Sequence, residues 1–460
     1  MTASTISARS PAVARRPPAA LVPSTAWLLA GCLALAALSL LGPSQPTYDP
    51  TAWLIWGRDI IHWDLHTTAG PSWKPLPVLF TTPFALAGDG AAPMLWLVVA
   101  RAGGLLAIAL GFRLATRLAG PVAGVLAVVA MVLAEQFVFN FWRGNSEGLL
   151  VALALWAIER HLDGRRWQTF ALAVAAGLLR PEVWPFVALY GLWLVWGDWR
   201  AAGAPPWRTI AIVVASGIGV IALWLVPEYI GSGDFLRAAS RATEPVANSP
   251  AQADRPFVAV FQNSHGALSI PVYVGGVMAV VFAAVAWRRR REGGAVLAIA
   301  AIATALMIIV AVFAEIGFTG NLRYITLPAA LVCVLAGIGW ADLLHALRGR
   351  FGVAVAVAAG VAALAASAAF LISDARRFGD EMDKMRSAAT LGGALPGAID
   401  RAGGEAAIKR CGRVSTVPLQ TQSVAWRLHL QQVQVAAPPL PTGTRFHPRG
   451  EGWEVKQTCR

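Results

Sequence analysis

The sequence has few charged residues. Asp, Glu, Lys and Arg make up 14% of the 460 residues, 57% are hydrophobic, and the mean hydropathy is +0.58. A water-soluble protein of this length cannot keep so apolar a surface in solution, so that class is excluded. Several apolar runs also reach the roughly 20 residues that a helix needs to cross a bilayer. The composition therefore predicts an all-α polytopic membrane protein.

Cysteine is scarce, with four residues in the whole chain, and no Cys-x-x-Cys pair indicates a zinc site. Cys32 and Cys333 lie in apolar runs, where we expect them to pack without reacting. Cys411 and Cys459 lie in the polar C-terminal tail. These two could form a disulfide if the tail lies outside the cytoplasm.

Glycine-rich nucleotide motifs are missing too. The sequence contains no Walker-type phosphate loop and no dinucleotide fingerprint, so nothing points to ATP or to a nucleotide sugar. His62 and His66 have the spacing of a metal pair on a helix, but "TTAG" follows at once and argues against a helix there. We therefore predict no metal site and no cofactor, and leave open whether a divalent cation takes part.

The net charge of +13 invites a nucleic-acid interpretation. Most arginines, however, fall in short loops between apolar runs, where positive charge fixes the orientation of a membrane protein. No basic stripe with interleaved aromatic residues appears outside those loops. Nucleic-acid binding is not expected.

The apolar runs predict about eleven transmembrane helices after a disordered cytoplasmic arm, 1–24. The first run is taken as an uncleaved anchor. The predicted spans are 25–42, 93–112, 121–137, 147–160, 167–179, 183–196, 209–226, 269–287, 293–314, 323–340 and 352–373.

The basic loops set the predicted orientation. With the N-terminus in the cytoplasm, segments such as "ERHLDGRR", "RRRRE" and "HALRGR" all lie inside. An odd number of spans then places the tail, 374–460, outside as a small, loosely built domain after the transmembrane domain, 25–373. The same count places a first outer loop, 43–92, and a long loop, 227–268, outside. The predicted location is the cell membrane, with a cytoplasmic N-terminus and an extracytoplasmic C-terminus.

The first outer loop holds a dense polar and aromatic stretch, "TYDPTAWLIWGRDIIHWDLHTTAGPSWKPLPVLF" (Thr47 to Phe80). Asp49 and Pro50 are typical of a helix start, because Asp caps free N–H groups and Pro fits the first turn. Trp53, Trp56 and Trp63 then recur near helical spacing. This pattern predicts an interfacial helix with its aromatic face in the headgroup layer.

The arrangement resembles the GT-C glycosyltransferases, polytopic enzymes that use polyprenyl-phosphate sugars. In their protein O-mannosyltransferase and lipid A aminoarabinose transferase branches, an Asp follows the first span and a Lys-Pro motif comes later. Asp49 matches that Asp, although Pro50 stands where a second acid is common. The other matching motifs, spread over about 25–345, are "KPLP" (Lys74 to Pro77), "FWRGNSEGLLVALALWA" (Phe141 to Ala157), "LLRPEVW" (Leu178 to Trp184) and "GNLRYITLPAALV" (Gly320 to Val332).

The resemblance implies that Asp49 is the base that takes the acceptor proton. The leaving phosphate needs cations, and several lie at the outer span ends, against the charge trend that orients the chain. The predicted phosphate-binding residues are Arg58, Lys74, Arg180, Arg323 and Tyr324. The predicted acceptor- or sugar-binding residues are Glu147, Glu182 and His265, with 227–268 as an acceptor-side lid. Alternatively, Asp49 only caps a helix, and the cations snorkel or form ion pairs with Glu147, Glu182 or Glu315.

The sequence thus predicts an enzyme that moves a sugar from a polyprenyl phosphate to an extracytoplasmic glycan, lipid or protein. A transporter or flippase for a lipid-linked glycan is one alternative. It should show mid-span charges and internal repeats, and neither is evident. A non-catalytic cell-envelope assembly protein with the same fold is the other.

Overall fold

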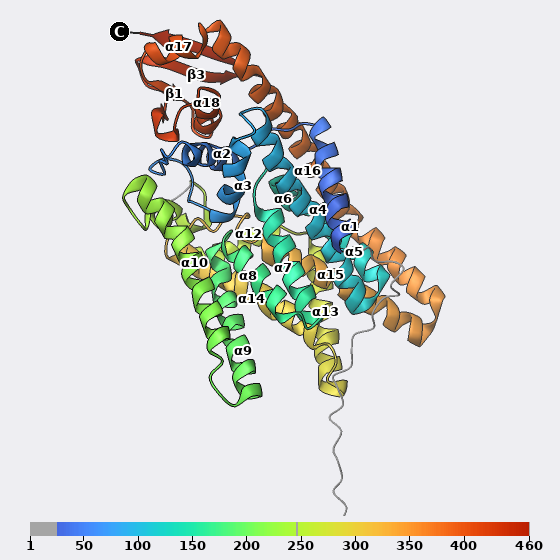
Figure 1. The fold of residues 1–460 in the computed structure, drawn as a ribbon. Coiled ribbons are helices and arrows are strands. Elements are labelled where there is room, and N and C mark those ends of the chain that lie inside the picture. Colours follow the sequence, from blue (N-terminus) through green and yellow to red (C-terminus); the bar gives the residue numbers. More distant parts are fainter. Residues whose placement is uncertain (1–24, 245–246, 460) are drawn as a thin grey trace, which may run out of the picture.

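The computed structural model describes residues 25–244 and 247–459 (Figure 1). The predicted N-terminal arm, 1–24, lies outside the described residues. A helical bundle carries a smaller C-terminal unit at one end, and the long helix α16 connects the two. The helices are α1 (Thr25–Leu38), α2 (Tyr48–Ile61), α3 (Pro75–Ala85), α4 (Ala91–Ala119), α5 (Pro121–Leu133), α6 (Glu135–Trp142), α7 (Glu147–Leu162), α8 (Arg166–Gly177), α9 (Trp184–Ala202), α10 (Trp207–Ser232), α11 (Arg237–Ala242), α12 (Pro256–Asn263), α13 (Ile270–Arg290), α14 (Gly294–Glu315), α15 (Thr326–Phe351), α16 (Val353–Arg401), α17 (Gly404–Arg410) and α18 (Thr421–Arg427).

Every predicted span coincides with a helix or, at 121–137, with the helix pair α5 and α6. Among the described residues, six helices are long and apolar enough to cross a bilayer, and they become seven if α5 and α6, bent by 69°, form one broken span. The six are α4, α10, α13, α14, α15 and α16. The other predicted spans form helices that fall short in length or hydropathy. The chain is thus a multi-pass membrane protein.

Small residues let the central helices approach closely. A Cβ added at Gly339 of α15 would lie 2.0 Å from the carbonyl oxygen of Gly275 in α13. On another face of α15, a Cβ at Gly337 would lie 2.3 Å from the carbonyl oxygen of Ala123 in α5. Close backbone packing of this kind is how helices associate where lipid offers no hydrophobic driving force. It places α15 at the centre of the bundle, with its first turn facing the polar cluster described below.

The first outer loop folds into α2 and α3, but its tryptophans do not all lie in the headgroup layer. Trp53 and Trp56 are fully buried within the protein, whereas Trp63 is exposed. The Trp53 ring packs edge-on against Trp96 of α4, with ring centroids 5.5 Å apart, and Trp56 packs on Trp73. The prediction of a lipid-facing aromatic surface is therefore wrong for Trp53 and Trp56, because α3, α4 and the C-terminal unit cover α2.

The C-terminal unit contains a sheet, so the all-α expectation is wrong for this segment. Strands β1 (Val414–Thr416), β2 (Val435–Ala436), β3 (Gly443–Arg449) and β4 (Gly452–Thr458) lie in the order β2-β1-β3-β4. Strand β1 pairs in parallel with β2 and β3, and β3 pairs antiparallel with β4. The strands were missed because β1 and β2 have only three and two residues, and because β3 and β4, with seven each, consist largely of polar residues. Helix α16 also runs on to Arg401, well past the predicted end at residue 373.

Polar contacts hold the C-terminal unit on the first outer loop. Arg58 of α2 donates hydrogen bonds to the carbonyl oxygens of Trp426 (3.2 Å) and Leu430 (2.8 Å). The Gln431 amide donates to the Asp64 carboxylate at 2.6 Å. These contacts join segments more than 350 residues apart in the chain and fix the unit above α2.

A disulfide between Cys411 and Cys459 closes the C-terminal unit across 48 residues of chain. We expect the double variant Cys411→Ser/Cys459→Ser to lower the free energy of unfolding of this unit by about 2–4 kcal/mol, because the open chain has more conformations to lose on folding. Limited proteolysis over a temperature series measures this: cleavage within 411–459 should begin at a lower temperature. The control is Cys32→Ala, at a buried free cysteine of α1. Identical cleavage of wild type and double variant would show that the bond carries no stability.

Candidate functional site

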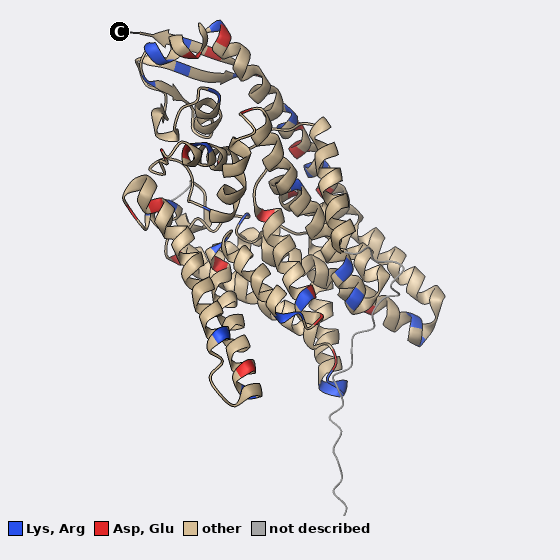
Figure 2. Ribbon diagram, in the orientation of Figure 1, with Lys and Arg blue, Asp and Glu red and all other residues tan. Residues whose placement is uncertain are grey.

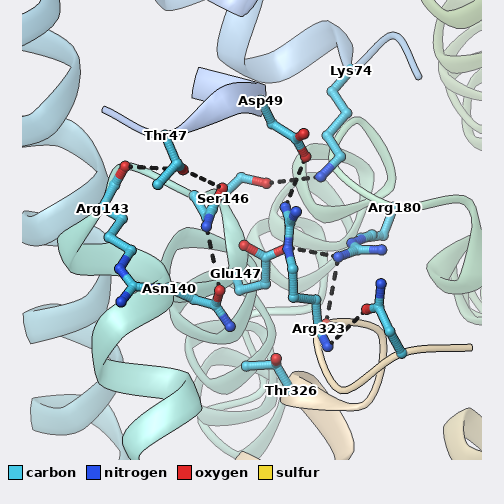
Figure 3. A network of polar contacts seen from close by, with 12 residues as sticks. Thr47, Asp49, Lys74, Asn140, Arg143, Ser146, Glu147, Arg180, Arg323 and Thr326 are labelled. Carbon is cyan, nitrogen blue, oxygen red and sulfur yellow. Dashed lines mark hydrogen bonds and ion pairs between the residues drawn. The ribbon is translucent and has the colours of Figure 1, made fainter. Parts of the chain in front are cut away.

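Charged residues are sparse in the middle of the bundle helices and lie toward both ends of the bundle and in the C-terminal unit (Figure 2). Beneath the junction of the bundle and the C-terminal unit, one cluster draws its residues from five separate parts of the chain (Figure 3). Its charged members are Asp49, Lys74, Glu147, Arg180, Glu182 and Arg323. All six were predicted as site residues, and they converge because each lies at or near the same end of a bundle or loop helix.

Glu147 is the centre of the cluster. It is the first residue of α7, and its side chain is completely buried. One carboxylate oxygen, Oε1, accepts hydrogen bonds from Arg180 at 2.6 Å and from Arg323 at 3.1 Å. The helix N-terminus adds a favourable field for the negative charge. The other oxygen, Oε2, has no hydrogen-bond partner among the described residues. Glu147 therefore orients two guanidinium groups at once.

Asp49 lies in the first turn of α2 and points into the cluster. Its Oδ2 accepts a hydrogen bond from the Arg323 guanidinium at 2.9 Å. The side chain is 18% exposed, so a bound molecule can reach it. The N-cap residue of α2 is Thr47, so the carboxylate of Asp49 is engaged by Arg323 and does not serve as the cap. The structure thus brings a carboxylate and a guanidinium together in a partly open position.

Lys74 enters the cluster from the loop that precedes α3. Its Nζ lies 3.4 Å from Ser146 Oγ and 5.2 Å from the centre of the Trp53 ring. Burial, followed by the positive charges of Arg180 and Arg323, lowers the pKa of Lys74 to about 7, and Glu147 and Asp49 offset this only in part. A bound anion at this position would therefore stabilise the charged form of Lys74.

Arg180 and Arg323 complete the cationic side. The Arg180 guanidinium lies 4.4 Å from the centre of the Tyr324 ring and 3.7 Å from Glu182. Burial alone would lower the pKa of Arg323, but the carboxylates of Glu147 and Asp49 outweigh burial and raise it. Both guanidiniums thus stay charged, and each is oriented by a carboxylate as a rigid fork of donors. Such a fork suits phosphate oxygens.

Two predicted residues lie elsewhere. Arg58 faces the C-terminal unit, where it binds two carbonyl oxygens and stacks at 5.0 Å on the Trp426 ring. His265 is exposed in the single turn η5 (Ser264–Gly266), and the ring contact the structure shows for it is with Tyr273 at 6.4 Å. Arg58 thus contributes to the docking of the C-terminal unit, and neither residue is brought to the cluster.

Several cluster residues were not predicted. Ser146 contacts Lys74, and the neighbouring Asn145 Oδ1 lies 3.4 Å from the hydroxyl of Thr47. Together these contacts tie the start of α7 to the start of α2. The signal was present in the polar run "RGNSE" before an apolar helix, since polar side chains that become buried need hydrogen-bond partners inside the protein.

An apolar cavity of about 620 Å³ lies between α7, α8, α9, α14 and α15. Val183, which follows Glu182 in the chain, and Leu327, the second residue of α15 and four residues after Arg323, line it. His161, Tyr190 and Trp193 also line it. The charged cluster and the apolar cavity therefore draw on neighbouring residues of the chain.

The segment that begins the predicted long loop, 227–268, is held by hydrogen bonds and an ion pair to the rest of the protein. Arg237 donates to the carbonyl oxygens of Pro71 at 2.7 Å and Gly70 at 3.0 Å, and it lies 3.6 Å from the buried Glu228. Glu228 in turn accepts a hydrogen bond from the Trp73 backbone at 3.2 Å. In this structure the start of the 227–268 loop thus clamps the segment that leads to Lys74.

The fold is similar to those of solved membrane transferases. The crystal structure of ArnT, an aminoarabinose transferase from Cupriavidus metallidurans, bound to undecaprenyl phosphate, matches with a TM-score of 0.53 and 15% identity, over 89% of this chain and 86% of that one. Its apo structure matches with a TM-score of 0.53 and 16% identity, over 88% and 85%. No protein-family model and no curated protein sequence matches the chain. The predicted resemblance to the GT-C superfamily is confirmed at the level of the fold.

Proposed function

We propose that the chain is a membrane glycosyltransferase that moves a sugar from a polyprenyl phosphate to a hydroxyl group outside the cytoplasm. One observation carries the proposal. The Arg323 guanidinium lies 2.9 Å from the Asp49 carboxylate and belongs to a buried cluster that also contains Lys74 and Arg180. A carboxylate beside three cations is what this transfer requires, because a proton must be removed while a phosphate departs.

In the proposed reaction, Asp49 accepts the proton of the acceptor hydroxyl. The acceptor oxygen forms a bond to the anomeric carbon, and the bond from that carbon to the phosphate oxygen breaks. The electron pair of the broken bond leaves with the phosphate, whose new charge Lys74, Arg180 and Arg323 stabilise. Electrostatic stabilisation by preorganised groups is usually the largest contribution in such sites. Glu147 and Glu182 hold the cations in place.

The apolar cavity supports a lipid-linked donor. A polyprenyl chain is hydrocarbon throughout and is attached directly to the phosphate, so its binding site must join a cationic end to an apolar space. The 620 Å³ cavity is lined by Val183 and Leu327, which follow Arg180 and Arg323 closely in the chain. The similar fold of ArnT, which was solved with undecaprenyl phosphate bound, supports the same donor class.

The Cys411–Cys459 disulfide supports an extracytoplasmic C-terminus, because structural disulfides persist mainly in oxidising compartments. The basic loops support the same orientation, with a cytoplasmic N-terminus. The cluster then lies on the outer side of the cell membrane, where a lipid-linked sugar is the available donor.

The test is a transfer assay with the purified protein in proteoliposomes. A panel of radiolabelled polyprenyl-phosphate sugars is offered together with an extract of cell-envelope acceptors. We expect label to move from the lipid to a non-lipid or new lipid product with at least one donor, and not in empty vesicles. Label that crosses the bilayer while still on its original lipid would instead favour a flippase. Failure of every donor to react or to cross would favour an assembly role without chemistry.

Donor binding should depend on pH through Lys74. A charged ammonium group binds phosphate more strongly than a neutral amine does. Affinity for a polyprenyl-phosphate sugar should therefore weaken as pH rises through the pKa of about 7 that Lys74 has in the protein without donor. The phosphodiester of the donor does not titrate in this range. We expect a loss of about tenfold or more between pH 6.5 and 8.5, measured by equilibrium binding to protein in nanodiscs.

The control for this experiment is Lys74→Arg, because a guanidinium stays charged throughout the range. Its affinity can be lower than that of wild type, but its pH profile should be flatter. An equal slope in both proteins would show that Lys74 does not carry the titration.

A further inference from the structure

A second cavity of about 350 Å³ lies between the bundle and the C-terminal unit. Its wall combines five parts of the chain: the start of the first outer loop, the end of α6, the C-terminal part of α16, the start of α18 with the turn before it, and the turn between β3 and β4. The polar side chains that line it are Gln45, Thr47, Tyr48, Arg143, Ser387, Gln420 and Ser423. The volume is within the range of small-molecule sites, about 300–1,000 Å³.

The lining of this cavity mixes polar side chains with apolar ones such as Met385, Leu391 and Leu419, and it is almost neutral. Among the described residues that line it, Arg143 carries the one charged side chain. The Arg143 guanidinium is paired with Glu381 of α16 at 2.5 Å, so its charge is balanced. The remaining polar groups are hydroxyls and amides, which both donate and accept hydrogen bonds. Trp142 and Tyr48 add aromatic surface.

This chemistry fits an uncharged, polyhydroxylated molecule. A saccharide offers many hydroxyl groups with neutral partners and apolar C–H faces that pack on aromatic rings. An anionic lipid headgroup would need cations that this wall does not offer. A peptide is usually held through an exposed strand edge, a groove for a helix or charged end groups. The mixture of hydroxyls, amides and aromatic rings therefore favours a saccharide.

The cavity is close to the candidate base. Thr47 and Tyr48 line it, and Asp49 is the next residue in the chain. Two residues of chain span at most about 7 Å, so the Thr47 wall lies within that distance of the Asp49 backbone. The backbone N–H of Thr47 also donates to the carbonyl oxygen of Arg143 at 3.2 Å, which joins two walls of the cavity. The cavity thus lies beside the backbone of the first turn of α2, from which Asp49 extends into the charged cluster.

We infer that this cavity is the acceptor subsite and that it holds a neutral saccharide. The inference deepens the proposed function. That the bound saccharide is the acceptor rests on the proposed function. The binding of a saccharide can, however, be measured without any transfer. Failure of the binding test is therefore distinguishable from failure of the transfer assay, which does not depend on where the acceptor binds.

The test measures equilibrium binding of radiolabelled mannotriose and cellotriose to the full chain in nanodiscs. The blocking variant is Ala388→Trp, because Ala388 lines the cavity from an exposed helical position where an indole can fill it. The matched control is Ala375→Trp, at an exposed position of the same helix that does not line the cavity. Gln420→Ala/Ser423→Ala removes two hydrogen-bonding groups without filling the space.

We expect saturable binding of at least one trisaccharide to wild type and to Ala375→Trp. Ala388→Trp should bind at least about tenfold more weakly, and the Gln420/Ser423 variant about tenfold more weakly. Undecaprenyl phosphate should bind all of them equally, which shows that the variants are folded. Absence of trisaccharide binding to wild type, or equal affinity in Ala388→Trp, overturns the inference. Binding of a neutral hexapeptide that Ala388→Trp abolishes, without saccharide binding, also overturns it in favour of a peptide acceptor.

Discussion

Replacing Asp49 with asparagine is expected to lower the rate of sugar transfer by about 10²–10⁴-fold, the usual contribution of a positioned general base. Asparagine keeps the size of the side chain and can still accept a hydrogen bond from Arg323, but it cannot take the acceptor proton. Because the substitution removes a negative charge beside Arg323, affinity for the donor phosphate should stay equal or rise. The measurement is the initial rate of label transfer, together with donor affinity, for protein at matched abundance in proteoliposomes.

The matched control for Asp49 is Asp64→Asn in the same outer loop, where the exposed carboxylate binds Gln431 at the docking surface. This variant should transfer sugar within about twofold of wild type, because surface substitutions of this kind change little. If Asp49→Asn transferred sugar at the wild-type rate, Asp49 would not be the base. The proposed transfer would then need another carboxylate.

Asp59 is the rival carboxylate on the same helix. It is buried, and burial raises its pKa to about 7, a value suited to a general base. Yet Asp59 lies ten residues beyond Asp49 on α2, or about 15 Å along the helix axis at 1.5 Å per residue. Its neighbour Arg58 faces the C-terminal unit and not the cluster. Geometry therefore favours Asp49, and Asp59→Asn should retain transfer activity.

Much of the fold could be predicted from the sequence because lipid restricts a spanning segment to a helix and demands long apolar runs. Each of the eleven runs does contain helix. The number of crossings is harder to predict, since an apolar run can form a helix such as α8, which has 12 residues and is too short to cross a bilayer alone. The sheet of the C-terminal unit was missed because β1 and β2 are very short, and because β3 and β4 carry mainly polar side chains that give little hydrophobic alternation.

Most of the charged residues of the candidate site could be predicted from the sequence. Charged residues at the ends of apolar runs need partners when they are buried, and Glu147, Arg180 and Arg323 do converge. Arg58 could not be separated from them by sequence, because its partners, Trp426 and Leu430, lie about 370 residues away. The same holds for Trp53 and Trp56: amphipathic spacing shows that one face is buried, but not whether lipid or protein covers it.

Glu147→Gln is expected to have the largest effect on stability. Removing one partner of a buried charge pair costs about 3–5 kcal/mol, and the lower end applies here because the Arg323 side chain is 29% exposed. Transfer should fall by about 100-fold, since small displacements of positioning groups cost that much. The measurements are the thermal unfolding midpoint in nanodiscs and the transfer rate. The control is Glu182→Gln, which removes a carboxylate 3.7 Å from Arg180 that does not contact Arg323, and it should have a smaller effect on both.

A purely structural role for Glu147 and a role in holding the phosphate-binding cations differ in one respect. Without Glu147, the remaining carboxylates beside Lys74, Arg180 and Arg323 are Asp49 and Glu182. The cluster therefore gains net positive charge and binds an anion more strongly. Undecaprenyl phosphate should therefore raise the unfolding midpoint of Glu147→Gln by more than it raises that of wild type, because a ligand that binds only the folded state stabilises it according to its affinity. If the lipid phosphate gave the same increase in both proteins, the cations would not be the phosphate site. The lipid phosphate could instead raise the unfolding midpoint of Glu147→Gln by more than that of wild type while the transfer rate of the variant stays low. That result would show that the cluster binds phosphate and that Glu147 acts by aligning the two guanidiniums with Asp49.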